Sequence, residues 1–133
     1  RIGVFGVGVE LKGLVPDNLF GETIYLDPIE MATEIVGILK HKKCDLIICL
    51  SHLGYSYDTT QISDLKLAEN TAGIDLIIGG HTHTFLDKPT SVINKSGQIT
   101  LVNQVGWAGL RLGRLDFDIE KRYFKSDSGI MVQ

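Results

Sequence analysis

Unbroken apolar runs alternate with amphipathic segments along the first 80 residues, and this alternation predicts a parallel α/β sheet. Strands are predicted over Ile2–Val9, Leu46–Leu50 and Ile74–Ile78, because strands covered on both faces of a parallel sheet read as continuous apolar segments. Helices are predicted between them, the first ending at about Lys42 and the second spanning Ile62–Asn70. Successive units of strand, loop and helix imply right-handed crossovers and parallel pairing of the strands.

The first helix has clear signals at its start. Asp27 can cap it, Pro28 suits the first helical position, and Glu30 completes a capping box with Asp27. Its apolar face is predicted from residues at helical spacing, Met31, Ile35, Ile38 and Leu39.

In the second helix the residues expected to face inward are Leu65, Leu67 and Ala68. Between Lys12 and Glu22, glycine, proline and polar residues predict a loop.

Short strands with turn signals replace this pattern after residue 89. A hairpin is predicted from Thr90–Ile93 and Gln98–Gln104, because the Asn-Lys-Ser-Gly turn separates two β-rich runs. Apolar and acidic residues alternate at the end of Leu110–Ile119, which predicts one long strand with a wet face. Lys121–Phe124 is predicted to turn back as an edge strand.

Composition places the chain among globular proteins. Its 133 residues fit one domain, with 44% apolar and 22% charged residues, and no run approaches the roughly 18 apolar residues of a membrane span. The net charge of -3 gives no general attraction to nucleic acid. Cys44 and Cys49 lie too far apart in an extended segment to form a disulfide. Because the chain starts on Arg1 and enters an apolar run at once, we expect a piece of a longer protein.

Three of the four histidines follow two of the predicted strands. His52 ends the run that starts at Asp45, while His81 and His83 follow the run that starts at Asp75. Parallel pairing would place these imidazoles side by side at the carboxyl edge of the sheet, where ligands bind in open α/β folds. Convergent imidazoles predict a metal site, against the alternative that they are ordinary loop histidines.

The loop that carries two of these histidines has residues suited to a tight structure. In an extended loop, His81 and His83 would point to the same side of the backbone. Gly80 and the glycine before it allow a sharp turn and a close approach of the backbone. Thr82 and Thr84 can hold the loop through hydrogen bonds between side chain and backbone.

The motifs Gly-Gly-His-Thr-His at 79–83 and Ser-His-Leu-Gly at 51–54, each closing a predicted strand, resemble those of calcineurin-like metallophosphoesterases. The similarity is to the 5'-nucleotidase branch, whose closing strand and glycine turn resemble residues 102–115. The resemblance covers nearly the whole chain. It implies a partial metallophosphoesterase β-sandwich, with parallel strands flanked by helices and followed by antiparallel hairpins, as the C-terminal half of a catalytic domain over residues 1–133.

By this resemblance, His52 and His81 would be ligands of one metal and His83 a ligand of the other, in a site for two divalent ions such as zinc or manganese. Such a pair of ions clamps a phosphate and generates hydroxide for in-line attack. The implied reaction is hydrolysis of a phosphate monoester, with a nucleotide as the expected substrate. The resemblance also favours the periplasm or the cell surface as the location.

The sequence departs from the family pattern in one important respect. The aspartate and histidine motifs that supply the bridging carboxylate and the catalytic histidine would lie before Arg1, so no catalytic residue is expected within this chain. Three imidazoles alone could hold one ion weakly or none, and the isolated chain is expected to be inactive. A sheet face left open by the missing half is expected to drive self-association.

Several other features have competing interpretations. A phosphate loop at Gly3–Gly8 is disfavoured, because no strand precedes it and no helix follows. Asp58 and Asp64 could orient an imidazole, but helix capping and exposure explain them equally well. Trp107 could stack at the mouth of the site, although a core plug is favoured. The rival to an enzyme is a non-catalytic binding module that keeps the fold with structural histidines.

Overall fold

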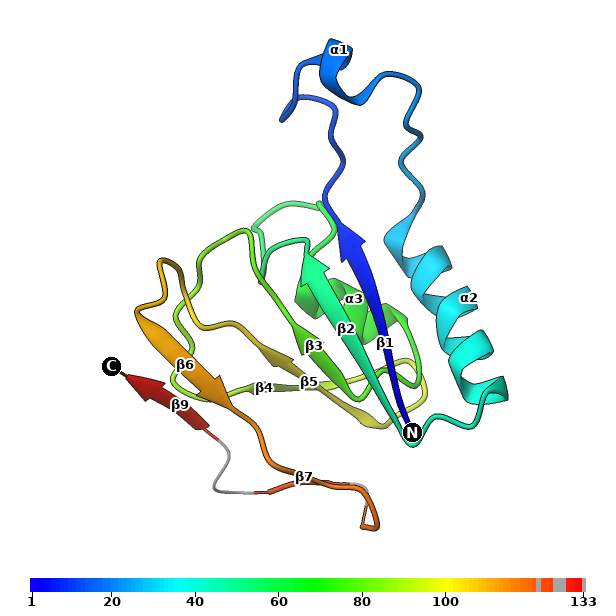
Figure 1. The fold of residues 1–133 in the computed structure, drawn as a ribbon, viewed down its shortest axis with the longest axis vertical. Coiled ribbons are helices and arrows are strands. Elements are labelled where there is room, and N and C mark those ends of the chain that lie inside the picture. The colour runs from blue at the N-terminus through cyan, green and yellow to red at the C-terminus, as the bar shows by residue number, and fades with distance from the viewer. Residues whose placement is uncertain (122, 126–128, 133) are drawn as a thin grey trace.

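The computed structural model describes residues 1–121, 123–125 and 129–132, with residues 123 and 129–132 described by their backbone. The elements, in chain order, are β1 (Ile2–Gly8), α1 (Asp17–Phe20), α2 (Pro28–His41), β2 (Leu46–His52), α3 (Asp64–Asn70), β3 (Leu76–Ile78), β4 (Thr90–Ile93), β5 (Ile99–Asn103), β6 (Arg111–Arg114), β7 (Phe117–Asp118), β8 (Tyr123–Phe124) and β9 (Gly129–Val132). Figure 1 shows their arrangement around one main sheet.

The main sheet has five strands in the order β1-β2-β3-β5-β4. The first four are parallel to their neighbours, and β4 is an antiparallel strand at one edge. In this register Gly8 pairs with His52 and Ile78 pairs with Asn103, so the carboxyl ends of the parallel strands meet at one edge of the sheet. The expected fold class is therefore confirmed, including parallel strands followed by antiparallel hairpins.

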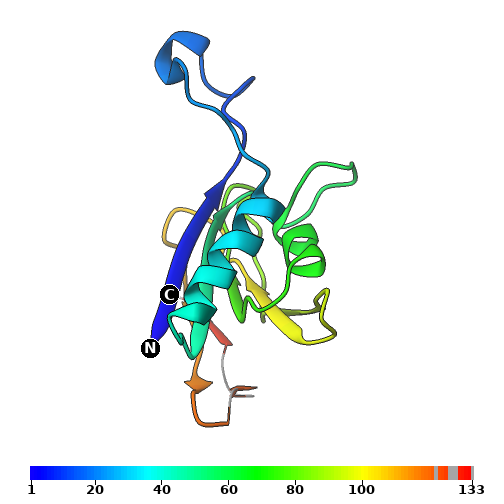
Figure 2. The ribbon, with the colours of Figure 1, turned by 90° about the vertical axis from the view of Figure 1, so that its right-hand side faces the viewer.

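One face of the sheet is covered by α2 and α3, as the side view in Figure 2 shows. The core lies between these helices and that face, and its fully buried side chains are Ala32, Cys49, Leu53, Leu67, Ala68, Ile74, Ile77 and Val102. The buried stripe of α2 is centred on Ala32 and Val36. The predicted apolar face is built on Met31, Ile35, Ile38 and Leu39, so the buried stripe lies about one residue further along the helix. The prediction is therefore wrong at Ile38, which is exposed.

The other face of the sheet is apolar and partly open. Ile2 and Val4 of β1 are 54% and 52% exposed, and Leu50 and Ile78 at the ends of β2 and β3 are 49% and 41% exposed. The sequence predicts strands covered on both faces. This is confirmed at the start of β2 and β3, where Leu46 and Leu76 are buried, and it is wrong for β1 and for the ends of β2 and β3. The expected exposed face is confirmed, since period-2 alternation directs these four side chains away from the helices.

Polar side chains fix where the two longer helices begin. The Asp27 carboxylate accepts hydrogen bonds from the backbone N–H groups of Ile29 and Glu30, at 2.8 and 3.0 Å, which confirms the predicted cap. The Ser63 hydroxyl accepts from the N–H of Lys66 at 3.3 Å. Because Ser63 is the cap, α3 begins at Asp64, two residues later than predicted.

The C-terminal part forms two small antiparallel pairs. The predicted strand over Leu110–Ile119 is divided into β6 and β7, because β6 pairs with β9 while β7 pairs with β8. The predicted hairpin of β4 and β5 is confirmed, and the N–H of Asn94 donates to the carbonyl of Gln98 at 2.8 Å across its turn.

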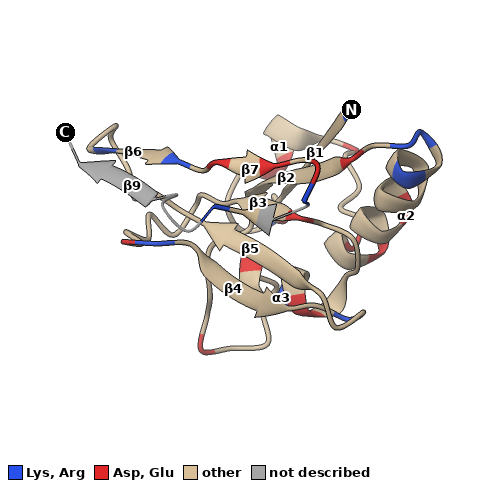
Figure 3. Ribbon diagram, turned by 90° about the horizontal axis from the view of Figure 1, so that it is seen from below, with Lys and Arg blue, Asp and Glu red and all other residues tan. Residues whose placement is uncertain are grey.

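Residues 9–27 leave the body of the molecule as a projecting segment that carries α1 (Figure 1). The sequence predicts a loop here, and the four-residue helix α1, which has no buried residue, is the element that the prediction missed. Lys and Arg gather at the C-terminal end of α2, as Figure 3 shows, and His41 at this end is exposed. Among the residues described, no helix is both long and apolar enough to cross a bilayer.

Candidate metal centre

Two of the three predicted site histidines meet at the carboxyl edge of the sheet. His52 is the last residue of β2, and His81 lies in the loop after the neighbouring strand β3. Their ring centroids are 5.1 Å apart, with an interplanar angle of 71°. Gly80 lies against this pair, because a Cβ at that position would be 3.3 Å from Nδ1 of His52. The predicted juxtaposition of His52 and His81 and the close approach at Gly80 are therefore confirmed.

His83 lies in a different environment. Its ring stacks on the indole of Trp107, with centroids 5.8 Å apart and an interplanar angle of 14°. Trp107 is 57% exposed, so the favoured interpretation of a core plug is wrong. Trp107 is the first residue of a tight turn, since Ala108 and Gly109 both have positive φ and the N–H of Leu110 donates to the carbonyl of Trp107 at 3.3 Å.

The loop after β3 has a left-handed backbone at both histidines. His81 has a φ of 69° and His83 a φ of 54°, values that residues other than glycine seldom adopt. The extended loop assumed in the sequence analysis is therefore wrong. The N–H of Thr82 donates to the carbonyl of Gly80 at 2.9 Å, which closes a three-residue turn around His81 in the rare γ-turn form. Backbone strain of this kind persists only where the surroundings hold it in place.

Hydrogen bonds from neighbouring segments supply that support. The Thr82 hydroxyl accepts from the backbone N–H of Tyr55 at 2.9 Å and lies 2.9 Å from the Thr84 hydroxyl. The predicted hydrogen bond between side chain and backbone is thus confirmed for Thr82, whereas the Thr84 hydroxyl contacts the Thr82 hydroxyl. Gln104, just beyond β5, contacts the same loop through its side-chain amide. Sequence reasoning missed this glutamine, because no local pattern links residue 104 to a loop about twenty residues earlier.

Asp64 is fully buried beneath the same edge of the sheet. One of its carboxylate oxygens accepts from the Ser51 hydroxyl at 2.5 Å, and the other has no hydrogen-bond partner and faces Gly79. Burial raises the pKa of Asp64 to about 6, against a smaller lowering by the Ser51 hydrogen bond. The interpretation of this residue as exposed or as a helix cap is wrong, since Ser63 caps α3. Asp58 is exposed, as expected.

The distance between His52 and His81 fits two imidazole ligands of one ion. Two imidazoles bound to a tetrahedral zinc at 2.0–2.1 Å would have ring centroids about 5 Å apart, and the distance here is 5.1 Å. Within the described part of the chain, no group of three or more His, Cys, Asp or Glu side chains could hold an ion. The residues therefore fit part of a metal centre, and its remaining ligands would have to come from elsewhere.

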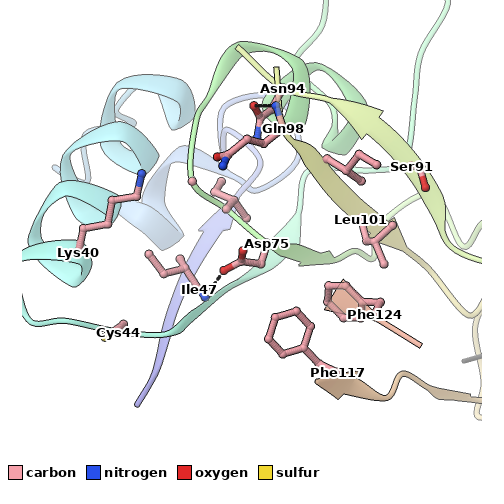
Figure 4. A pocket seen from close by; sticks show the side chains of 13 residues that line it. Lys40, Cys44, Ile47, Asp75, Ser91, Asn94, Gln98, Leu101, Phe117 and Phe124 are labelled. Atoms are coloured by element: carbon pink, nitrogen blue, oxygen red, sulfur yellow. Dashed lines mark hydrogen bonds between the residues drawn. The ribbon is translucent and has the colours of Figure 1, made fainter. Parts of the chain in front are cut away.

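A cavity of about 820 Å³ lies near the opposite edge of the sheet, where the parallel strands begin (Figure 4). Lys40, Asp75, Leu101, Phe117 and Phe124 are among its lining residues, and the Asp75 carboxylate accepts from the N–H of Ile47 at 2.7 Å. It contains none of the four histidines. The chemistry therefore places the candidate site at the histidine edge and not in this cavity.

The chain is similar in sequence and in fold to known proteins. It is 36% identical over 124 residues to the trifunctional nucleotide phosphoesterase protein YfkN of Bacillus subtilis strain 168, covering 92% of this chain and 8% of YfkN. A solved structure of the 5'-nucleotidase precursor from Thermus thermophilus matches 81% of this chain and 23% of that one, with a TM-score of 0.68 and 34% identity.

The solved structure of the calcineurin-like phosphoesterase YfkN from Bacillus subtilis matches in fold over 98% of this chain and 44% of that one, with a TM-score of 0.66 and 24% identity. No family model matches the chain. The chain thus spans less than half the length of each of these proteins.

Proposed function

The resemblance to calcineurin-like phosphoesterases of the 5'-nucleotidase group is confirmed by these matches, and we propose on this premise that the chain is the C-terminal half of a catalytic domain in a longer protein. That protein would hydrolyse phosphate monoesters, with nucleotides as substrates, in a reaction that depends on divalent metal. The observation that carries the proposal is the pair His52 and His81, with ring centroids 5.1 Å apart at the ends of adjacent parallel strands.

His52 and His81 would hold one ion, and His83 would contribute to a second. Divalent ions at such a site clamp the phosphate and supply a hydroxide nucleophile at neutral pH. The His83 ring stacks on Trp107. To bind an ion, His83 would have to direct a ring nitrogen at the ion while one face of its ring stays on the indole. Gly80 leaves room for the His52 ring. The buried Asp64 carboxylate accepts a hydrogen bond from Ser51, the residue before His52 in the chain.

The isolated chain is proposed to be inactive. A two-metal site needs carboxylate ligands that bridge and balance the ions. Asp64, beneath this edge of the sheet, is buried behind Gly79 and accepts a hydrogen bond from Ser51, so it does not supply them. The remaining ligands and the catalytic histidine would come from the part of the longer protein that precedes Arg1.

The open apolar sheet face, Ile2, Val4, Leu50 and Ile78, is proposed to be the surface on which that other part packs. Without it, the 133-residue chain would self-associate through this face. Light scattering after gel filtration tests this, with Val4→Lys as the perturbing variant. Wild-type chain that elutes as a monomer and binds no hydrophobic dye would contradict the proposal.

Activity of the full-length protein tests the main proposal. We expect it to release phosphate from nucleoside monophosphates when divalent metal is added, and we expect chelation to stop this release. His81→Ala should abolish turnover, while His41→Ala, a matched change at an exposed histidine on α2, should leave it unchanged. Full turnover in His81→Ala, or activity that survives chelation, would refute the proposed function.

A non-catalytic binding module is the second candidate, and the stacking of His83 on Trp107 favours it. In that case the full-length protein would bind a phosphate ester or nothing, without turnover. We further propose, from the family resemblance, that the protein acts in the periplasm or at the cell surface. Recovery of the full-length protein in the cytosolic fraction of its own cells would contradict that location.

A further inference from the structure

Gln104 occupies an unusual position beneath the histidine loop. Its side chain is buried, although glutamine normally lies at the surface. The amide nitrogen donates to the carbonyl of Gly80 at 2.7 Å, and Oε1 accepts from the Thr82 hydroxyl at 3.1 Å and from the backbone N–H of Thr84. One side chain therefore contacts the loop before His81, between the two histidines, and after His83.

Those contacts bracket the two strained residues. His81 and His83 both have positive φ, and the carbonyl of Gly80 and the N–H of Thr84 are the backbone groups immediately outside them. Fixing these two groups restrains the left-handed conformation of both histidines, which residues other than glycine seldom adopt without support from their surroundings.

The glutamine is itself held in place by main-chain pairing. The N–H of Leu86 donates to the carbonyl of Gln104 at 3.3 Å, and the N–H of Gly106 donates to the carbonyl of Thr84 at 2.9 Å. The Thr82 hydroxyl, which donates to Gln104, also accepts from the N–H of Tyr55, three residues after His52. Gln104 is thus linked to both loops that carry the candidate ligands.

We propose that Gln104 is a positioning residue that presets the backbone of His81 and His83 for metal binding. This inference rests on the proposed function for its purpose, but the restraint of the loop can be measured without it. Neutral amides suit this position, because a single side chain must both donate to a carbonyl and accept from an N–H and a hydroxyl.

The test uses Gln104→Met, which keeps the length of the side chain and removes its hydrogen bonds, in the full-length protein. The matched control is Gln98→Met, at an exposed glutamine in the turn between β4 and β5. Hydrogen exchange followed by mass spectrometry should show residues 80–86 exchanging at least tenfold faster in Gln104→Met and unchanged in Gln98→Met. Titration with Co²⁺, followed by its visible absorption, should show affinity reduced about 10- to 100-fold in Gln104→Met alone.

Each result decides a separate point. Unchanged exchange and unchanged Co²⁺ affinity in Gln104→Met would overturn the inference, and so would a lowered melting temperature with unchanged Co²⁺ affinity, which indicates a merely structural role. If Gln104→Met does not fold, Thr82→Val, which removes the hydroxyl between Gln104 and Tyr55, must raise the exchange of residues 80–86 and weaken Co²⁺ binding, or the inference fails. Wild-type protein that binds no Co²⁺ refutes the proposed function and the metal-positioning role, while the exchange data show whether Gln104 restrains the loop.

Discussion

Replacing Asp64 by asparagine should remove a specific pH dependence of stability. The folded protein raises the pKa of this carboxyl from 3.8 to about 6 through burial. Between these values the folded state therefore binds more protons than the unfolded state, and stability falls as the pH rises. For a single group with these two pKa values, the loss between pH 4.5 and pH 7 is about 2 kcal/mol.

Urea unfolding of the wild-type chain, Asp64→Asn and Asp58→Asn at pH 4.5 and pH 7 measures this loss. Asparagine keeps an oxygen that can accept from the Ser51 hydroxyl but cannot ionise. The stability of Asp64→Asn relative to wild type should therefore rise by about 2 kcal/mol from pH 4.5 to pH 7. Asp58→Asn, at an exposed residue, should show no such change. A difference between wild type and Asp64→Asn that is the same at both pH values would refute the reasoning.

Three further outcomes are expected. Gly106→Ala should destabilise the chain by about 2–4 kcal/mol in urea unfolding, because a Cβ there would lie 2.2 Å from the Phe85 ring. The control is Gly97→Ala, which has the same φ of 78° but open space around it and should cost about 1 kcal/mol. Asp27→Ala should cost about 1 kcal/mol and fray the start of α2, measured by unfolding and circular dichroism. Burial raises the pKa of Cys49 to about 12, so this thiol should resist iodoacetamide at pH 8 until the chain unfolds, and labelling of the native chain at Cys49 would count against its burial.

The sequence predicts those features that depend on neighbouring residues or on simple periodicity. The two apolar runs before His52 and His81 identify adjacent strands, and parallel pairing then places both imidazoles at one edge. Asp27 and Pro28 likewise identify the start of α2 from local chemistry alone.

The features that sequence reasoning missed depend on contacts between distant residues. The burial of Asp64 follows from the packing of α3 under the loop that contains Gly79, which no local pattern encodes. The positive φ of His83 and the exposure of Trp107 depend on a glycine turn and a ring stack that join separate segments. Leu110–Ile119 alternates as a strand should, yet its two ends find different partners, so tertiary pairing overrides the pattern.

The projecting segment 9–27 has a consequence for how relatives of this chain can diverge. Its two ends lie close together, because Val7, Pro28 and Met31 line one hollow at its base. Each doubling of the length of such a connection costs only about 0.6 kcal/mol in closure entropy. Insertions, deletions or a genetically encoded reporter should therefore be accommodated at the far end of this segment, around α1, whereas its first residues leave β1 beside His52, the register partner of Gly8. The far end is thus the natural place for length variation between homologous genes.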